Sequence, residues 1–103
     1  MEKLIKDGRV AVLVSRGFGA GWSTWISDYP ECLFDPVLAQ MIVDGADEME
    51  IATVAQKRYP EAYLGGLDGL DVEWLPVGTK FRVDEYDGAE SIEILDEVRW
   101  EVA

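Results

Sequence analysis

The chain of 103 residues contains no histidine and only one cysteine, Cys32, and these two shortages exclude much of common enzyme chemistry. Histidine is the side chain that most often serves as general base, metal ligand or activator of a nucleophile near neutral pH. Cys32 has neither a histidine to activate it nor a second cysteine for an internal disulfide. We therefore expect a protein that is not an enzyme, that holds no metal or cofactor, and that resides in a reducing cytoplasm.

Basic residues are scarce as well, because 9 Lys and Arg stand against 21 Asp and Glu, which gives a net charge of −12. Nucleic-acid phosphates need a basic surface, so we expect no direct nucleic-acid partner. The absence of a long apolar run argues against a membrane span. With 49% hydrophobic residues, the composition predicts one folded domain over residues 1–103. Exposed aromatic residues on so small a domain favour a homo-oligomer, although the sequence does not fix the subunit number.

Local patterns predict the fold class. The apolar run Val10–Val14 indicates a central strand that is buried on both faces. Asp35-Pro36 begins a helix that Gly45 stops, and a second helix is expected over Ala46–Tyr59. Strand patterns then follow at Val72–Leu75, at Lys80–Asp84, from Ser91 after an Asp87-Gly88 hairpin turn, and at Val98, Trp100 and Val102. The prediction is an α+β fold, with an antiparallel β-sheet and two short helices in a single compact domain.

The most distinctive segment is the glycine-rich loop after the first strand. Residues 8–27 hold no acidic side chain, and three alternate glycines precede two tryptophans that flank a Ser-Thr pair. The spacing matches neither the dinucleotide fingerprint nor the P-loop. Glycines nevertheless permit a nest of backbone N–H groups that binds an anion, with a guanidinium, hydroxyls and indole rings beside it. The predicted ligand-binding residues are Arg16, Gly17, Phe18, Gly19, Gly21, Trp22, Ser23, Thr24 and Trp25.

The same residues allow a second interpretation without any ligand. The glycines would form a tight crossing of the backbone, and both tryptophans would pack in the core, with Ser23 and Thr24 capping locally. The glycines of residues 65–69 are interpreted as a flexible connection or as a mobile rim over a pocket. Carboxylates that cluster around the later turns are explained mainly by turn chemistry. A metal-dependent hydrolase built on them ranks last, because no stretch reproduces a calcium loop.

Three stretches carry a resemblance: IKDGRVAVLVSRGFGAGWSTW (5–25), DYPECLFDP (28–36) and GTKFRVDEYDGAESIEI (78–94). Together they resemble a group of small acidic proteins encoded by bacteriophages and prophages. The group has no assigned catalytic or ligand residue, so the resemblance carries none over to this chain. It implies a setting, namely a small accessory protein that acts by binding inside an infected bacterium.

Two function hypotheses follow. The first is a non-enzymatic counter-defence protein that sequesters a small anionic, nucleotide-like ligand at residues 16–25, in a pocket that a second subunit would complete. The second is an acidic inhibitor that mimics nucleic acid or docks on a basic host enzyme, through the acid-rich segments 28–50 and 84–97.

Overall fold

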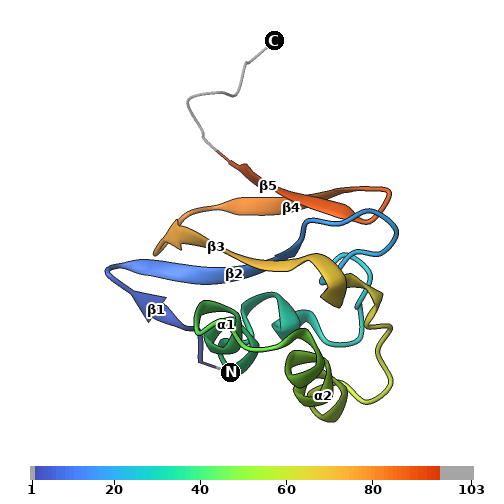
Figure 1. The fold of residues 1–103 in the computed structure, drawn as a ribbon. Helices are drawn as coiled ribbons and strands as arrows, with labels where there is room; N and C mark the ends of the chain where they lie inside the picture. The colour runs from blue at the N-terminus through green and yellow to red at the C-terminus, as the bar shows by residue number, and fades with distance from the viewer. Residues whose placement is uncertain (1, 96–103) are drawn as a thin grey trace.

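The fold, given by a computed structural model that describes residues 2–95, consists of antiparallel strands and two α-helices (Figure 1). This confirms the predicted α+β class. Two short 3-10 helices, η1 and η2, complete the described elements. In chain order the elements are β1 (Ile5–Lys6), β2 (Arg9–Ser15), η1 (Pro30–Phe34), α1 (Pro36–Val43), α2 (Glu48–Arg58), η2 (Gly65–Gly69), β3 (Leu70–Pro76), β4 (Phe81–Tyr86) and β5 (Ala89–Ile94).

The strands divide into two sheets stacked in layers. One sheet has the order β1-β2-β3, and the β4-β5 hairpin forms the other. Figure 1 shows the helices on one face of the three-stranded sheet and the hairpin on its opposite face. Strand β2 therefore packs on both sides: Ala11 and Leu13 belong to the helix-side core, whereas Val12 and Val14 belong to the core beneath the hairpin. The predicted central strand, buried on both faces, is confirmed.

Side-chain caps set the helix boundaries. The Asp35 carboxylate accepts the backbone N–H groups of Val37 at 2.9 Å and Leu38 at 3.1 Å, and this begins α1 as predicted. Gly45 follows the end of α1 with a φ of +76°, a conformation that glycine adopts without strain. Helix α2 begins two residues later than predicted, because the Asp47 side chain caps it by accepting the N–H of Met49.

The Asp87-Gly88 turn is confirmed, since both residues have positive φ values of 54° and 90°. This two-residue turn lets strand pairing resume at once, with Tyr86 opposite Ala89. Strand β5 therefore begins at Ala89, ahead of the predicted Ser91. The strand alternation predicted at Val98, Trp100 and Val102 lies outside the described residues.

Candidate functional site

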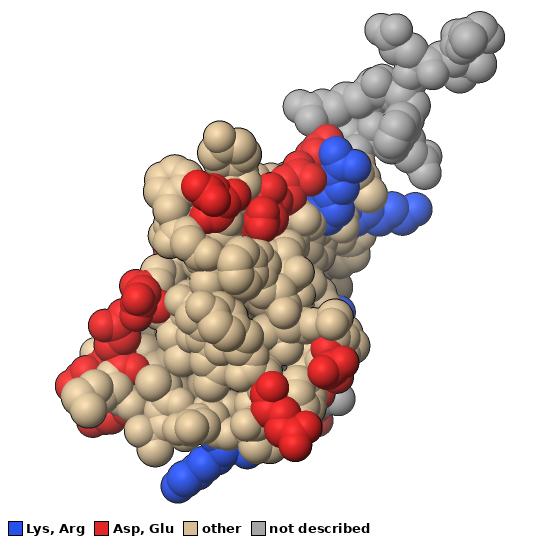
Figure 2. All heavy atoms as spheres, turned by 90° about the vertical axis from the view of Figure 1, so that its right-hand side faces the viewer, with Lys and Arg blue, Asp and Glu red and all other residues tan. Residues whose placement is uncertain are grey.

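The glycine loop meets two other segments of the chain, the hairpin turn and η2. The N–H of Gly19 donates to the carbonyl of Asp87 at 2.5 Å, and the N–H of Arg16 donates to the carbonyl of Gly69 at 2.8 Å. Figure 2 looks onto the end of the molecule where the loop, the hairpin turn and η2 lie. Most of the predicted ligand-binding residues thus lie on a loop that is held between two other segments.

Glycines on these partner segments allow backbone to touch backbone. A Cβ on Gly66 would lie 2.4 Å from the carbonyl oxygen of Gly21, and a Cβ on Gly69 would lie 2.5 Å from the nitrogen of Gly17. Neither distance is compatible with a real side-chain carbon. The glycines of residues 65–69 therefore form a close crossing with the loop, so the flexible connection expected there is replaced by a tightly packed one.

A protein carboxylate occupies the concave side of the loop. Glu90, the second residue of β5, is 3% exposed. Its Oε1 accepts the N–H of Ser15 at 2.8 Å, and its Oε2 accepts the N–H of Trp22 at 2.9 Å. The same Oε2 accepts the N–H of Thr24 at 3.1 Å and its hydroxyl at 2.5 Å. Three backbone N–H groups and one hydroxyl thus converge on one carboxylate, and we call these donors the nest. None of the three N–H donors is a glycine, and the anion that they bind belongs to the chain itself.

Sequence reasoning missed Glu90 as a site residue, although the sequence contains a signal for it. In the hairpin register, Glu90 lies opposite Glu85, and Ile92 lies opposite Val83. Glu90 therefore shares a face with Ile92, which packs against the core beneath the hairpin. A carboxylate that falls on the apolar face of an alternating strand needs buried donors. The nest supplies them.

The first tryptophan of the loop is a core residue. Trp22 is fully buried, and its indole N–H donates to the carbonyl of Cys32 at 2.9 Å. Its ring makes an edge-to-face contact with Tyr59, with the ring centroids 6.1 Å apart. The alternative interpretation, core packing, therefore describes the side chain of Trp22, whereas only its backbone N–H reaches the nest.

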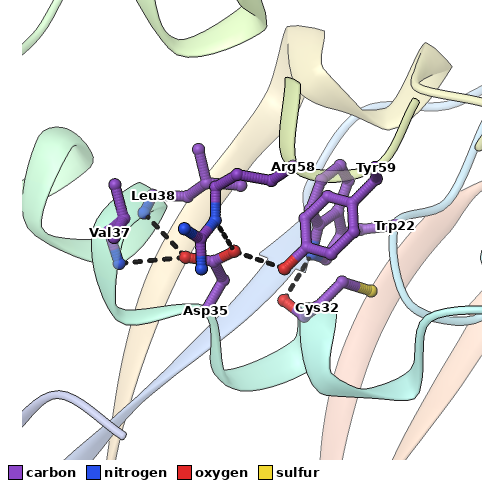
Figure 3. A network of polar contacts seen from close by, with 7 residues as sticks. All are labelled: Trp22, Cys32, Asp35, Val37, Leu38, Arg58 and Tyr59. Atoms are coloured by element: carbon purple, nitrogen blue, oxygen red, sulfur yellow. Dashed lines mark hydrogen bonds and ion pairs between the residues drawn. The ribbon is translucent and has the colours of Figure 1, made fainter. Parts of the chain in front are cut away.

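A buried polar network adjoins Trp22 and joins the two helices (Figure 3). The second oxygen of Asp35 accepts Arg58 Nε at 2.6 Å and also accepts the Tyr59 hydroxyl. The hydrogen bond to Asp35 raises the pKa of Arg58, and burial followed by the same carboxylate raises the pKa of Tyr59. Both Asp35 oxygens are thus fully used, one by the α1 cap and one by the end of α2. This network holds the helices together.

The thiol of Cys32 is not suited to act as a nucleophile. Its side chain is fully buried, and burial together with the charges of Glu31, Glu90 and Asp35 raises the pKa of the thiol to about 12. The reactive thiolate is therefore scarce at neutral pH.

The remaining loop side chains point to the surface or to the strands. Arg16 Nη2 donates to Glu73 Oε2 at 3.1 Å, and Arg16 Nε lies 3.8 Å from Asp71 Oδ2. Both carboxylates belong to β3, so this strand compensates the charge of Arg16.

Phe18 is 76% exposed. Trp25 is 42% exposed, and its indole N–H donates to Glu85 at 2.9 Å. Ser23, the residue that follows Trp22, is partly buried. The predicted ligand-binding residues are therefore divided between two environments. Trp22 and Thr24 contact Glu90 or the core, whereas Phe18 and Trp25 are exposed to solvent.

Trp25 also forms a ring pair on the surface. Its centroid lies 5.8 Å from that of Tyr63, with 30° between the planes, and Tyr63 is 62% exposed. We call Trp25 and Tyr63 the aromatic face. Exposed carboxylates lie on the same segments or next to them: Asp28, Glu61, Glu85 and Asp87. Figure 2 shows a broad uncharged area bordered by Asp and Glu, with Lys and Arg only at its margins.

Comparison with protein-family models, with curated proteins and with solved structures found no match. Within residues 2–95, no group of three or more Cys, Asp or Glu residues is arranged to hold a metal ion. None of the helices in that range is both long enough and apolar enough to cross a membrane. The site must therefore be interpreted from its own geometry.

Proposed function

We propose that this chain is a non-enzymatic binding protein that docks a basic segment of a partner protein on its aromatic face. The observation that carries the proposal is the Trp25–Tyr63 ring pair, in which both rings are exposed. The indole N–H of Trp25 donates to Glu85, which holds this ring in place. Large rings held in place on the surface offer contact area at little cost in side-chain entropy. Such rings are the residues that dominate binding energy at protein interfaces.

The chemistry of this face suits a cation. An arginine guanidinium or lysine ammonium binds to the face of an indole or phenol ring, and carboxylates beside the ring complete the contact. Glu85 already lies at the edge of the indole, and the other exposed carboxylates flank the same segments. The net charge of −12 would also accelerate the encounter with a basic partner.

The same geometry disfavours the small-anion hypothesis for the loop. Three backbone N–H groups and one hydroxyl of the nest are already bonded to Glu90, so an incoming anion would have to displace a buried carboxylate. Beside the aromatic face, the Glu85 carboxylate would repel it. Sequestration of a nucleotide-like ligand at residues 16–25 stays a prediction, as does the setting of a phage protein in the host cytoplasm.

A titration with peptides of defined charge tests the docking proposal. We would follow the indole signals of the full chain by NMR while adding an Arg-Gly repeat peptide, and in parallel a Glu-Gly repeat peptide. The Arg-Gly peptide should shift the Trp25 signal, and the Trp25→Ala and Tyr63→Ala variants should bind it about 3- to 30-fold more weakly. Met49→Ala is the matched control, because Met49 is a large apolar residue on α2 that is 78% exposed and does not belong to the aromatic face.

Two outcomes would count against docking. Equal affinity of the wild type and both aromatic variants would mean that only net charge attracts the peptide. Displacement of the Trp25 signal by cyclic dinucleotides or ADP-ribose, without any effect of the Arg-Gly peptide, would instead support the small-anion hypothesis.

A further inference from the structure

A recess lies at the opposite end of β2 from the glycine loop. It has a volume of about 540 Å³ and is lined by Lys6, Asp7, Arg9 and Trp74. Three of these residues belong to β1, the following turn and the start of β2, and Trp74 belongs to β3. The volume is within the range of sites for small ligands, about 300–1,000 Å³.

Strand register brings the two cations and the indole to one side of the sheet. Lys6 pairs with Arg9, and Trp74 pairs with Ala11, which lies two residues after Arg9. Ala11 and Trp74 both belong to the helix-side core, so Arg9 and Lys6 emerge on that side as well. The indole is half-buried, whereas Lys6 and Arg9 are exposed. The recess therefore has a half-buried aromatic wall and two exposed cationic side chains.

These groups have no partner within residues 2–95. Arg16, Arg58 and Arg82 each form ion pairs with carboxylates. Lys6 and Arg9 form none with any described residue, and the Trp74 indole N–H has no acceptor there, unlike the indoles of Trp22 and Trp25. Lys3 and Lys57 also form no ion pair within residues 2–95, so the distinguishing feature of Lys6 and Arg9 is that they line the same recess. Asp7 is the single acidic residue of the lining.

From this arrangement we propose that the recess binds a nucleoside phosphate. The guanidinium of Arg9 and the ammonium of Lys6 would hold the phosphate, since both are strong donors to phosphate oxygens. The indole of Trp74 would stack on the base, an interaction that every nucleobase offers. The Asp7 carboxylate lines the same recess and would accept a ribose hydroxyl or a base N–H, because an ionised carboxylate is a hydrogen-bond acceptor. This site is independent of the aromatic face.

The test uses the full chain with AMP, GMP, adenosine and inorganic phosphate as separate probes. We would record the indole N–H signals by NMR and assign Trp74 by the loss of its signal in Trp74→Phe. Both nucleotides should shift the Trp74 signal, and they should bind at least fivefold more tightly than adenosine or phosphate alone. Arg9→Gln and Lys6→Gln should each weaken binding of AMP at least fivefold.

Lys57→Gln is the matched control, because Lys57 is an exposed lysine on α2 and does not line the recess. Arg9 and Lys6 are exposed, so their variants should keep the melting temperature of the wild type, which thermal unfolding verifies. Equal binding of phosphate and AMP, or unchanged binding in Arg9→Gln, would overturn the proposal. So would a shift confined to the Trp25 signal, which would move the site to the glycine loop.

Discussion

The carboxylate of Glu90 accepts the backbone N–H of Trp22 at 2.9 Å, across 68 positions of sequence. The contact joins the start of β5 to the loop that follows β2, and it does so at a point where β-sheet hydrogen bonds are absent between the two sheets. A single buried anion thereby fixes the course of the loop. Because the indole of the same Trp22 lies in the helix-side core, Glu90 also connects the hairpin layer to the helix layer.

Replacing this anion by its neutral isostere should destabilise the fold. Glu90→Gln keeps the shape but loses the charge, and its amide NH₂ group faces N–H donors. We expect a decrease of about 2–3 kcal/mol in the free energy of unfolding, because buried donors lose a charged acceptor. Urea denaturation measures this decrease in the free energy of unfolding. Glu93→Gln, a variant of the same strand at a surface ion pair, should change that free energy by less than about 1 kcal/mol. Equal effects of the two variants would contradict the assigned role of Glu90.

Removing the carboxylate altogether should create a site for a free anion. Glu90→Ala leaves the N–H groups of Ser15, Trp22 and Thr24 without their acceptor. Acetate or formate should then raise the melting temperature of this variant, and should do so more than chloride at the same ionic strength. The wild type should not respond, since its nest is filled. A response of equal size in both proteins would show a general salt effect and would argue against a nest.

Local signals in the sequence were sufficient for several elements. Asp35-Pro36 predicted the start of α1 because the cap and the proline act within three residues. Asp87-Gly88 predicted the hairpin turn because the two positive φ values depend only on those residues. The run Val10–Val14 predicted a central strand because burial on both faces removes polar residues. In each case the physical cause lies within the segment that shows the pattern.

The division of the loop between core and surface had no such local cause. Trp22 and Trp25 have similar surroundings in the sequence, yet one packs against Tyr59 and the other against Tyr63. Which tryptophan is buried depends on where η1 and the hairpin approach the loop. The role of Glu90 depends on the same approach. A pattern of glycines predicts a nest, but it does not reveal whether a ligand or a distant carboxylate fills it.

Two alanine substitutions distinguish the glycines that permit backbone contact from those that do not. A Cβ on Gly69 would lie 2.5 Å from the nitrogen of Gly17, so Gly69→Ala must push η2 away from the loop. We expect it to lower the free energy of unfolding by about 1–3 kcal/mol, the usual effect of overpacking. A Cβ on Gly17 would meet only the Gly69 Cα at 4.0 Å, which is ordinary contact. Gly17→Ala should therefore be nearly neutral, although it interrupts the glycine pattern.

Denaturation of both variants, with the thermal midpoint as a second measurement, tests this difference. If Gly17→Ala proved the more harmful substitution, the loop would need glycine for its own conformation and not for its contact with η2.

Alkaline pH should weaken the fold through Cys32 and Tyr59. Burial first, and then nearby carboxylates, raise the thiol pKa from 9.0 to about 12, and burial with the Asp35 hydrogen bond raises the pKa of the Tyr59 phenol. The folded chain therefore keeps protons that the unfolded chain releases. This contribution to stability is complete below about pH 9 and is lost as the pH rises toward 12.

Above about pH 9 for Cys32 and above about pH 10 for Tyr59, the free energy of unfolding should fall by up to about 1.4 kcal/mol per pH unit for each group. Urea denaturation between pH 8 and pH 11 measures the slope. Cys32→Ala and Tyr59→Phe should each reduce it, because each removes one group that titrates only on unfolding. Tyr86→Phe, at a tyrosine that is 78% exposed, should leave it unchanged. Parallel slopes in all four proteins would mean that neither buried group controls the alkaline transition.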